Sequence, residues 1–199
     1  MTNVAGDLLK ILTVCSHNRT RSVMSMAMIQ AGLDRRLGQD RAVVRSLGFG
    51  PEDLPAIDDA VEAMRRRGLD VTGHRSRRVT AERIAPADMI LTAERDHVVE
   101  LAAVSQAAYR RTFTLPEFLT RAASDPMAEG RALGSWMQDL TADRSAADYL
   151  RSEAQDVWDP TGSSRRRFAE QVELIAAMCD QVVDIVVASF AGSSGGDGY

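Results

Sequence analysis

The chain has 199 residues, of which 45% are hydrophobic and 26% charged, and its formal net charge at pH 7 is -4. That length suits one domain with a single sizeable core, and the negative balance argues against a general electrostatic grip on nucleic acid. Only two cysteines, Cys15 and Cys179, are present, so we expect no disulfide framework and a cytoplasmic protein. The apolar stretch at residues 172–190 is interrupted by acidic side chains, so we expect no membrane span.

The first half of the chain predicts two strands that each lead into a helix. A short apolar run with β-branched residues predicts a strand at residues 11–15, and apolar side chains at helical spacing predict a helix at residues 22–37. The same signals predict a second strand at residues 42–47 and a helix at residues 56–67, which ends at a glycine. A turn at residues 48–55 joins these two elements.

The alternation continues in the second half of the chain. We predict a third strand at residues 88–92 and a helix at residues 93–108, followed by a fourth strand at residues 111–115 and a helical start at residues 116–123. A long helix at residues 165–188 closes the pattern. Four strands alternating with helices indicate the α/β class, with a four-stranded parallel sheet in a three-layer α/β/α arrangement.

Two segments lack this regular pattern. Residues 124–147 have weak periodicity and many Asp, Gly and Ser residues, which predicts an irregular or partly helical insertion. Residues 191–199 are rich in Gly and Ser, which predicts a flexible tail. We therefore expect residues 1–199 to form one domain that carries these two additions.

The strongest functional signal is the segment Cys15–Ser22, which reads Cys-Ser-His-Asn-Arg-Thr-Arg-Ser and lies between the first predicted strand and the first predicted helix. In open parallel sheets, ligands bind beyond the carboxyl ends of the strands, where this segment is expected. A loop of this length can turn successive backbone amides inward, and together with the positive end of the helix it can bind a dianion. We call this segment the phosphate loop.

Three side chains of the phosphate loop suit phosphate-ester chemistry. The field that binds a dianion also favours a thiolate over a thiol at Cys15, which makes this residue a nucleophile. The planar guanidinium of Arg21 can hold two phosphate oxygens, and the hydroxyl of Ser22 can donate a hydrogen bond to the departing sulfur. A structural core cysteine beside a surface arginine is the alternative, but the position between strand and helix favours the chemical interpretation.

With this loop the chain resembles the low-molecular-weight protein-tyrosine phosphatases. Further segments look like family landmarks in the expected order, and they are residues 46–48, 68–77, 87–91 and the late acidic loop 156–160. The resemblance implies a phosphatase-like open sheet and a phosphomonoester hydrolase, namely a protein-tyrosine phosphatase that acts through a phosphocysteine intermediate. It also implies that no cofactor and no metal is needed, and that the partner is a phosphorylated protein or a small phosphomonoester. It does not specify an oligomeric state.

The resemblance also assigns roles to individual residues. Asp159 matches the general acid of the family, which protonates the leaving group and later deprotonates water, and we expect Trp158 to favour its protonated form by desolvation. Asn18, Ser46 and His74 match positions that brace the loop through hydrogen bonds. Asn tolerates left-handed backbone conformations, so Asn18 also suits the bend of the loop. The Asp-Pro-Thr-Gly sequence that begins at Asp159 is also typical of a simple turn, and both interpretations can hold. The residues expected to surround the phosphate are Ser16, His17, Asn18, Arg19, Thr20 and Ser22.

The chain departs from the family pattern at several positions. His17 stands where the family usually has glycine, so we expect a backbone conformation there that is costly for a residue with a Cβ. Thr20 stands where many members have a second cysteine, so we expect no protective disulfide with the nucleophile. Thr161 and Gly162 replace an aromatic pair that lines the phosphotyrosine cleft, which leaves the substrate preference open. The candidates for a replacement wall are Phe49, Trp136 and Trp158.

Two other functions remain open at this point. Some relatives of this fold reduce arsenate, but that reaction needs a relay of cysteines, and Cys179 has no nearby thiol in the sequence, which favours a core role for it. A catalytically silent module that binds phosphate or phosphoproteins is motivated by His17 and by the missing aromatic pair. The presence of Cys15, Arg21 and Asp159 together favours the enzyme.

Overall fold

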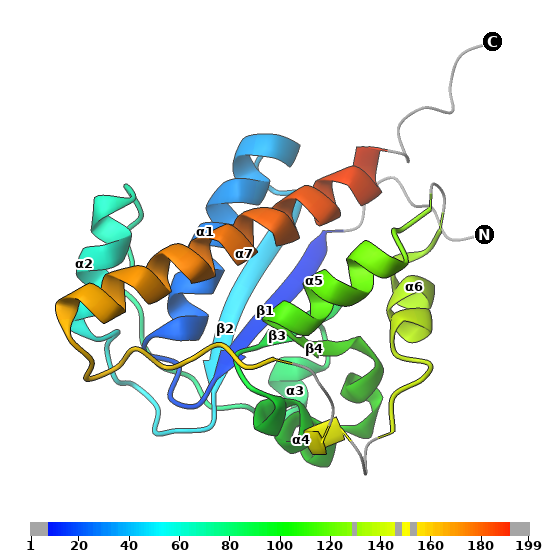
Figure 1. Ribbon diagram of the computed structural model, residues 1–199, viewed down its shortest axis with the longest axis horizontal. Coiled ribbons are helices and arrows are strands. Elements are labelled where there is room, and N and C mark those ends of the chain that lie inside the picture. The colour runs from blue at the N-terminus through cyan, green and yellow to red at the C-terminus, as the bar shows by residue number, and fades with distance from the viewer. Residues whose placement is uncertain (1–7, 129–130, 146–148, 152–154, 192–199) are drawn as a thin grey trace.

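A computed structural model describes residues 8–128, 131–145, 149–151 and 155–191 of the chain (Figure 1). Residues 192–199 of the predicted tail and small parts of the predicted insertion lie outside the described residues. The strands are β1 (Leu9–Cys15), β2 (Ala42–Gly48), β3 (Met89–Thr92) and β4 (Thr112–Thr114). The helices are α1 (Arg21–Leu37), α2 (Asp58–Arg66), α3 (Ala81–Ile84), α4 (Arg95–Val104), α5 (Leu115–Ser124), α6 (Leu133–Leu140) and α7 (Arg165–Ala191).

The four strands form one parallel sheet in the order β2-β1-β3-β4, which confirms the predicted α/β class. The register pairs Cys15 with Gly48 on one side of β1 and Val14 with Thr92 on the other. The carboxyl ends of β1, β2 and β3 therefore meet at one edge of the sheet. The loops that follow these three strands are brought together there, although they are far apart in the sequence.

Helices cover both faces of the sheet, because successive side chains of a strand point to opposite sides. Ile11 and Cys15 face a core that includes residues of α1, α2, α5 and α7, whereas Leu12 and Val14 face a second core with α3 and α4. Figure 1 shows the long helix α7 crossing the first of these faces beside α1. Gly32 permits this contact, since a Cβ at that position would lie 2.7 Å from Val183.

The structure differs from the predicted elements where short helices occur. The helix predicted at residues 93–108 ends at Val104, because Ser105 adopts an extended conformation before a 3₁₀ helix at Gln106–Arg111. Within the predicted insertion, α6 is a regular helix, and its Trp136 is only 1% exposed. The indole Nε1 of Trp136 donates a hydrogen bond of 2.8 Å to the carbonyl of Asp125. Trp136 is therefore excluded from the three candidates for a replacement wall, since its ring belongs to the core.

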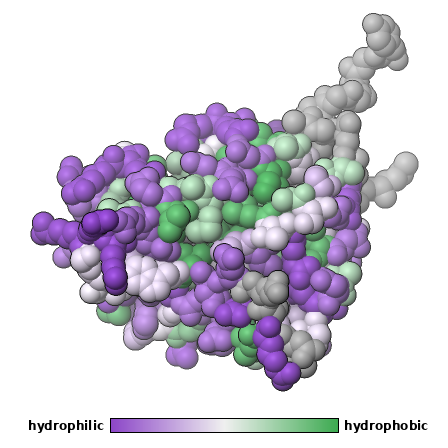
Figure 2. All heavy atoms as spheres, in the orientation of Figure 1, coloured by the Kyte–Doolittle hydropathy of each residue, from purple (hydrophilic) through white to green (hydrophobic). Residues whose placement is uncertain are grey.

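Hydrophilic side chains cover much of the face that Figure 2 shows, and apolar ones gather near its centre. Among the helices of the described ranges, none combines the length and the apolar composition needed to cross a bilayer.

Candidate active site

The phosphate loop lies between the end of β1 at Cys15 and the start of α1 at Arg21, as predicted. The loop after β2 supports it, because the backbone nitrogens of Phe49 and Gly50 both donate hydrogen bonds of 2.8 Å to the carbonyl of Ser16. The backbone of Gly48, at the end of β2, packs directly against the backbone of the phosphate loop. A Cβ at Gly48 would lie 2.5 Å from a backbone nitrogen and 2.7 Å from a backbone oxygen of the phosphate loop, so only glycine fits this strand end.

Asn18 makes the bend in the phosphate loop. Its φ of 53° lies in the left-handed region, which Asn tolerates better than most residues. Its side-chain amide donates to the hydroxyl of Ser22 at 3.0 Å and accepts from the backbone nitrogen of Arg77 at 2.9 Å. The Nε2 of His74 donates to the Asn18 carbonyl at 2.7 Å. Asn18 and His74 thus occupy the bracing positions expected for them, and the loop between β2 and β3 clamps the bend.

The backbone strain expected at His17 is absent, because positive φ values in this loop occur at Asn18 and not at His17. The side chain of His17 is exposed and its Cδ2 lies where a Cβ of Gly50 would come within 2.9 Å. The missing side chain of Gly50 therefore makes room for the imidazole. The prediction of a costly backbone conformation at His17 was wrong. The residue of this loop with a positive φ is the next one, Asn18.

The nucleophile and its expected partner are in contact. Cys15 is 3% exposed, and its sulfur lies 3.1 Å from the hydroxyl oxygen of Ser22. Because that oxygen accepts the hydrogen bond from Asn18, its own hydrogen is available to the sulfur. Ser46 behaves differently from the expectation, since its buried hydroxyl has no hydrogen-bond partner among the described residues. It lies beside the site without forming the brace that was expected.

Arg21 is 2% exposed and its terminal nitrogens are held by four groups. Nη1 forms an ion pair with Glu94 and donates to the carbonyl of Val157 at 2.8 Å. Nη2 donates to the hydroxyl of Ser16 at 3.1 Å and to Asp159 at 2.8 Å. Only the Nε–H, which is also buried, has no partner among the described residues. The four N–H groups of the terminal nitrogens are therefore in use, and the Nε–H remains as a donor for a further acceptor.

Asp159 lies against Arg21, so the structure brings the predicted nucleophile, cation and general acid together. Burial alone raises the pKa of Asp159, but hydrogen bonds from Thr161 and the charge of Arg21 outweigh it and hold the pKa below its ordinary value. The side chain of Trp158 is 49% exposed and does not enclose the carboxyl group. The expectation that Trp158 keeps Asp159 protonated by desolvation is therefore wrong for this arrangement.

The remaining side chains of the loop are engaged with neighbouring segments. The Nε of Arg19 donates to the carbonyl of Pro55 at 2.8 Å, and the hydroxyls of Thr20 and Thr161 lie 3.1 Å apart. The second of these contacts ties the phosphate loop to the late acidic loop. Both Arg19 and Thr20 therefore flank the loop, with their side chains directed to other parts of the chain.

Glu94 and His97 complete the site, and the sequence analysis did not identify either of them. His97 is 3% exposed, and its two ring nitrogens contact the backbone nitrogen of Glu94 and the hydroxyl of Ser16, each at 3.1 Å. Phe49 stacks on the imidazole with ring centroids 5.5 Å apart. The spacing of an N-cap residue and a hydrogen-bonding residue three positions later at the start of α4 was the only signal in the sequence.

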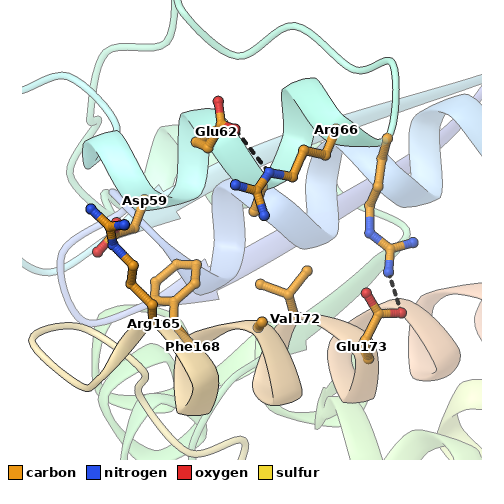
Figure 3. Close-up of a pocket in the computed structure, with 10 residues that line it drawn as sticks. Asp59, Glu62, Arg66, Arg165, Phe168, Val172 and Glu173 are labelled. Carbon is orange, nitrogen blue, oxygen red and sulfur yellow. Dashed lines mark hydrogen bonds and ion pairs between the residues drawn. The ribbon is translucent and has the colours of Figure 1, made fainter.

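A hollow of about 510 Å³ lies between α2 and the start of α7, and arginines line it (Figure 3). Its lining includes none of the predicted site residues. Glu62 pairs with Arg66 at 2.8 Å, which a dashed line in Figure 3 marks. Glu173 pairs with Arg67 at 2.6 Å. Two of the arginines that line the hollow are thus already paired with carboxylates, which makes it a weaker candidate than the phosphate loop. Within the described ranges, no group of His, Cys, Asp and Glu side chains is arranged to hold a metal ion.

Comparison with known proteins places this geometry in a family. The sequence profile of the low molecular weight phosphotyrosine protein phosphatases matches residues 10–137. The chain is 28% identical over 151 residues to a probable low molecular weight protein-tyrosine-phosphatase, EpsP of Ralstonia nicotianae, and the match covers 75% of this chain and 93% of that protein.

Solved structures share the fold. The YwlE arginine phosphatase from Geobacillus stearothermophilus superposes with a TM-score of 0.69 at 19% identity, covering 96% of this chain and 99% of that one. Vibrio vulnificus Wzb in complex with benzylphosphonate gives a TM-score of 0.66 at 20% identity, covering 89% and 99%. The sequence match and the shared fold together lead to one conclusion: the chain belongs to the low molecular weight phosphotyrosine protein phosphatase family and is a hydrolase of that kind.

Proposed function

We propose that this protein hydrolyses phosphomonoesters, with protein phosphotyrosine as the substrate, through a phosphocysteine intermediate on Cys15. The single observation that supports this most is the Nε–H of Arg21, which is buried in the phosphate loop without a partner among the described residues. An unsatisfied buried donor on a charged group is unfavourable by roughly 1–3 kcal/mol or more. A phosphate oxygen at Nε would satisfy it, and a second oxygen would take the place of Asp159 on Nη2, since Nε and Nη2 form one edge of the guanidinium with two parallel donors.

The reaction then runs in two displacements. The Cys15 thiolate attacks phosphorus, an S–P bond forms, and the bond from phosphorus to the ester oxygen breaks while Asp159 gives its proton to that oxygen. In the second displacement Asp159 takes a proton from water, the water oxygen bonds to phosphorus, and the S–P bond breaks. The hydroxyl of Ser22, at 3.1 Å from the sulfur, stabilises the thiolate that is released.

Asp159 must carry a proton in the first displacement, although its pKa is lowered in the arrangement described above. Its contact of 2.8 Å with Nη2 of Arg21 explains how this can change. A phosphate dianion on the Nε and Nη2 edge competes with Asp159 for the same cation and adds negative charge beside it. Both effects raise the pKa of a carboxyl group, so substrate binding itself would prepare the general acid.

The exposed indole of Trp158 supports an aromatic substrate, because it directly precedes the general acid and 49% of its surface is free. Phe49 is less suited to this role, since its ring is stacked on His97. A tyrosyl leaving group could lie against Trp158 while its phosphate occupies the loop. The proteins of similar fold include enzymes named arginine phosphatases, so phosphoarginine is the substrate to compare directly with phosphotyrosine.

The test is hydrolysis of p-nitrophenyl phosphate and of matched phosphotyrosine and phosphoarginine peptides by the wild type, Cys15→Ser and Asp159→Asn. We expect Cys15→Ser to lose turnover and still bind inorganic phosphate. We expect Asp159→Asn to be slower by roughly two to four orders of magnitude when the leaving group is poor. Phosphate binding without turnover in the wild type at any pH would instead support a silent binding module, and equal activity of the three proteins would refute the mechanism.

A further inference from the structure

The side chain of His97 contacts two of the residues that hold Arg21. Its Nδ1 lies 3.1 Å from the backbone nitrogen of Glu94, and its Nε2 lies 3.1 Å from the hydroxyl oxygen of Ser16. Glu94 pairs with Nη1 of Arg21 and Ser16 accepts from Nη2, so the imidazole is connected to both terminal nitrogens of the guanidinium. These contacts join the start of α4 to the phosphate loop, which comes 81 residues earlier in the chain.

The hydrogen-bond pattern determines which nitrogen of His97 carries its proton. A backbone N–H can only donate, so Nδ1 accepts from Glu94 and the proton is on Nε2, which donates to Ser16. The hydroxyl oxygen of Ser16 also accepts from Arg21, so both of its lone pairs are in use. Its own hydrogen is therefore free to be donated to another oxygen. Stacking of Phe49 on the imidazole fixes the plane of the ring, with an interplanar angle of 17°.

We propose that His97 is a positioning residue for phosphoryl transfer, which through Glu94 and Ser16 fixes the plane of Arg21 so that its Nε–H faces the phosphate loop. This inference rests on the proposed function of the loop. The same contacts leave the Ser16 hydroxyl hydrogen for an oxygen of the transferred phosphoryl group. The contacts described for the His97 side chain are with Glu94, Ser16 and Phe49, so it acts through these residues.

The role requires a neutral imidazole, because a protonated ring offers no acceptor to the Glu94 N–H. Burial lowers the pKa of His97 and the charge of Arg21 acts in the same direction, whereas Glu94, Asp96 and Asp156 act against them. The net shift is downward, so the ring stays neutral through the physiological range of pH. These are the charged groups that face the ring from α4, from α1 and from the late acidic loop.

The variants His97→Phe and Ser16→Ala separate the two contacts. Phenylalanine keeps a flat ring against Phe49 but has no nitrogen. Ser16→Ala keeps the contact between His97 and Glu94, and removes the hydroxyl that contacts His97 and Arg21 and that we assign to a phosphoryl oxygen. We expect the Ki of inorganic phosphate to rise by about tenfold or more in each of the two variants. If His97 acts partly through Ser16, the double variant will be less impaired than the product of the single effects predicts.

Thr114→Ala is the matched control, since Thr114 and Glu117 form the corresponding capping box at the start of α5. It should lower the melting temperature and leave the Ki of phosphate within twofold of the wild type. A His97→Phe variant that melts like this control but keeps a wild-type Ki would overturn the proposal. It would show that His97 caps a helix and does nothing for Arg21.

A readout without turnover keeps the inference separate from the proposed function. The Nε–H of Arg21 gives its own signal in a ¹H–¹⁵N correlation spectrum, identified by its loss in Arg21→Lys. We expect this signal to shift in His97→Phe and not in Thr114→Ala, and to respond to inorganic phosphate more weakly in His97→Phe than in the wild type. Lack of turnover in the wild type would refute the proposed function alone, whereas an Arg21 signal that is identical in His97→Phe would refute the positioning role.

Discussion

Replacing Arg21 by lysine separates the charge of this residue from the shape of its guanidinium. Four of the five N–H groups of Arg21 are bound by Glu94, Val157, Ser16 and Asp159, and the fifth is the Nε–H that we assign to phosphate. An ammonium has only three N–H groups and no planar edge. It can keep the ion pairs in part, but it cannot also present two parallel donors to an oxyanion.

The expected effect follows from one lost hydrogen bond between charged groups, which is worth about 1.5–3 kcal/mol. We therefore expect the dissociation constant for inorganic phosphate, measured by isothermal titration calorimetry, to rise by roughly 10- to 150-fold in Arg21→Lys. The carboxylates of Glu94 and Asp159 are 32% and 38% exposed, so water can replace the contacts that they lose and the variant should fold.

Arg144→Lys is the control for this experiment, because Arg144 is also buried and donates to the backbone carbonyls of Thr112 and Tyr109. It should lower the melting temperature without changing phosphate affinity. If Arg21→Lys bound phosphate within threefold of the wild type while remaining folded, the assignment of the Nε edge to phosphate would be wrong. The charge of the residue, and not its fork, would then be what the loop uses.

Three further outcomes follow from the structure. Gly48→Ala should abolish phosphate binding, because the new methyl group would lie 2.5 Å from a backbone nitrogen of the phosphate loop; calorimetry that shows wild-type affinity would contradict this close contact. Burial lowers the pKa of both His74 and His97, so the unfolded chain takes up protons first as the pH falls below about 6.5. The melting temperature should therefore decrease from about pH 7 to pH 5, and a flat profile would argue against two neutral buried rings. Burial also raises the pKa of Cys179 to about 12, so iodoacetamide should modify Cys15 alone in the folded protein, and mass spectrometry of Cys15→Ser should show no adduct.

Most features of the phosphate loop could be predicted from local sequence patterns. Its ends, its neighbouring strand and helix, and the contact of Cys15 with Ser22 all involve residues within one short segment, so spacing and residue type were sufficient to predict them. The four strands were predicted for the same reason, since runs of apolar and β-branched residues are local signals. Residue type also indicated that Asn18 suits the bend, and its φ of 53° agrees with this. Local patterns did not predict the hydrogen bonds that hold Asn18, which come from His74 and Arg77 in another loop.

The partners of Arg21 show what local patterns cannot decide. Glu94 lies 73 residues from Arg21 and Asp159 lies 138 residues from it. They meet because β3 pairs with β1, which places Glu94, the second residue after β3, beside the start of α1. The late acidic loop reaches the same place because the backbone nitrogen of Val157 donates to the carbonyl of Ala93, the first residue after β3. Sequence periodicity identifies a strand but carries no information on which strand becomes its neighbour.

The sequence alone determined the α/β class and the presence of a cysteine, an arginine and a serine that are suited to bind and attack a phosphate ester. The tertiary structure alone decided that Arg21 is held from four sides with one buried donor left over, and that His97 lies behind it. The physical reason is that residue type and spacing fix what a segment can do chemically, whereas the order of strands in the sheet decides which distant segments it meets.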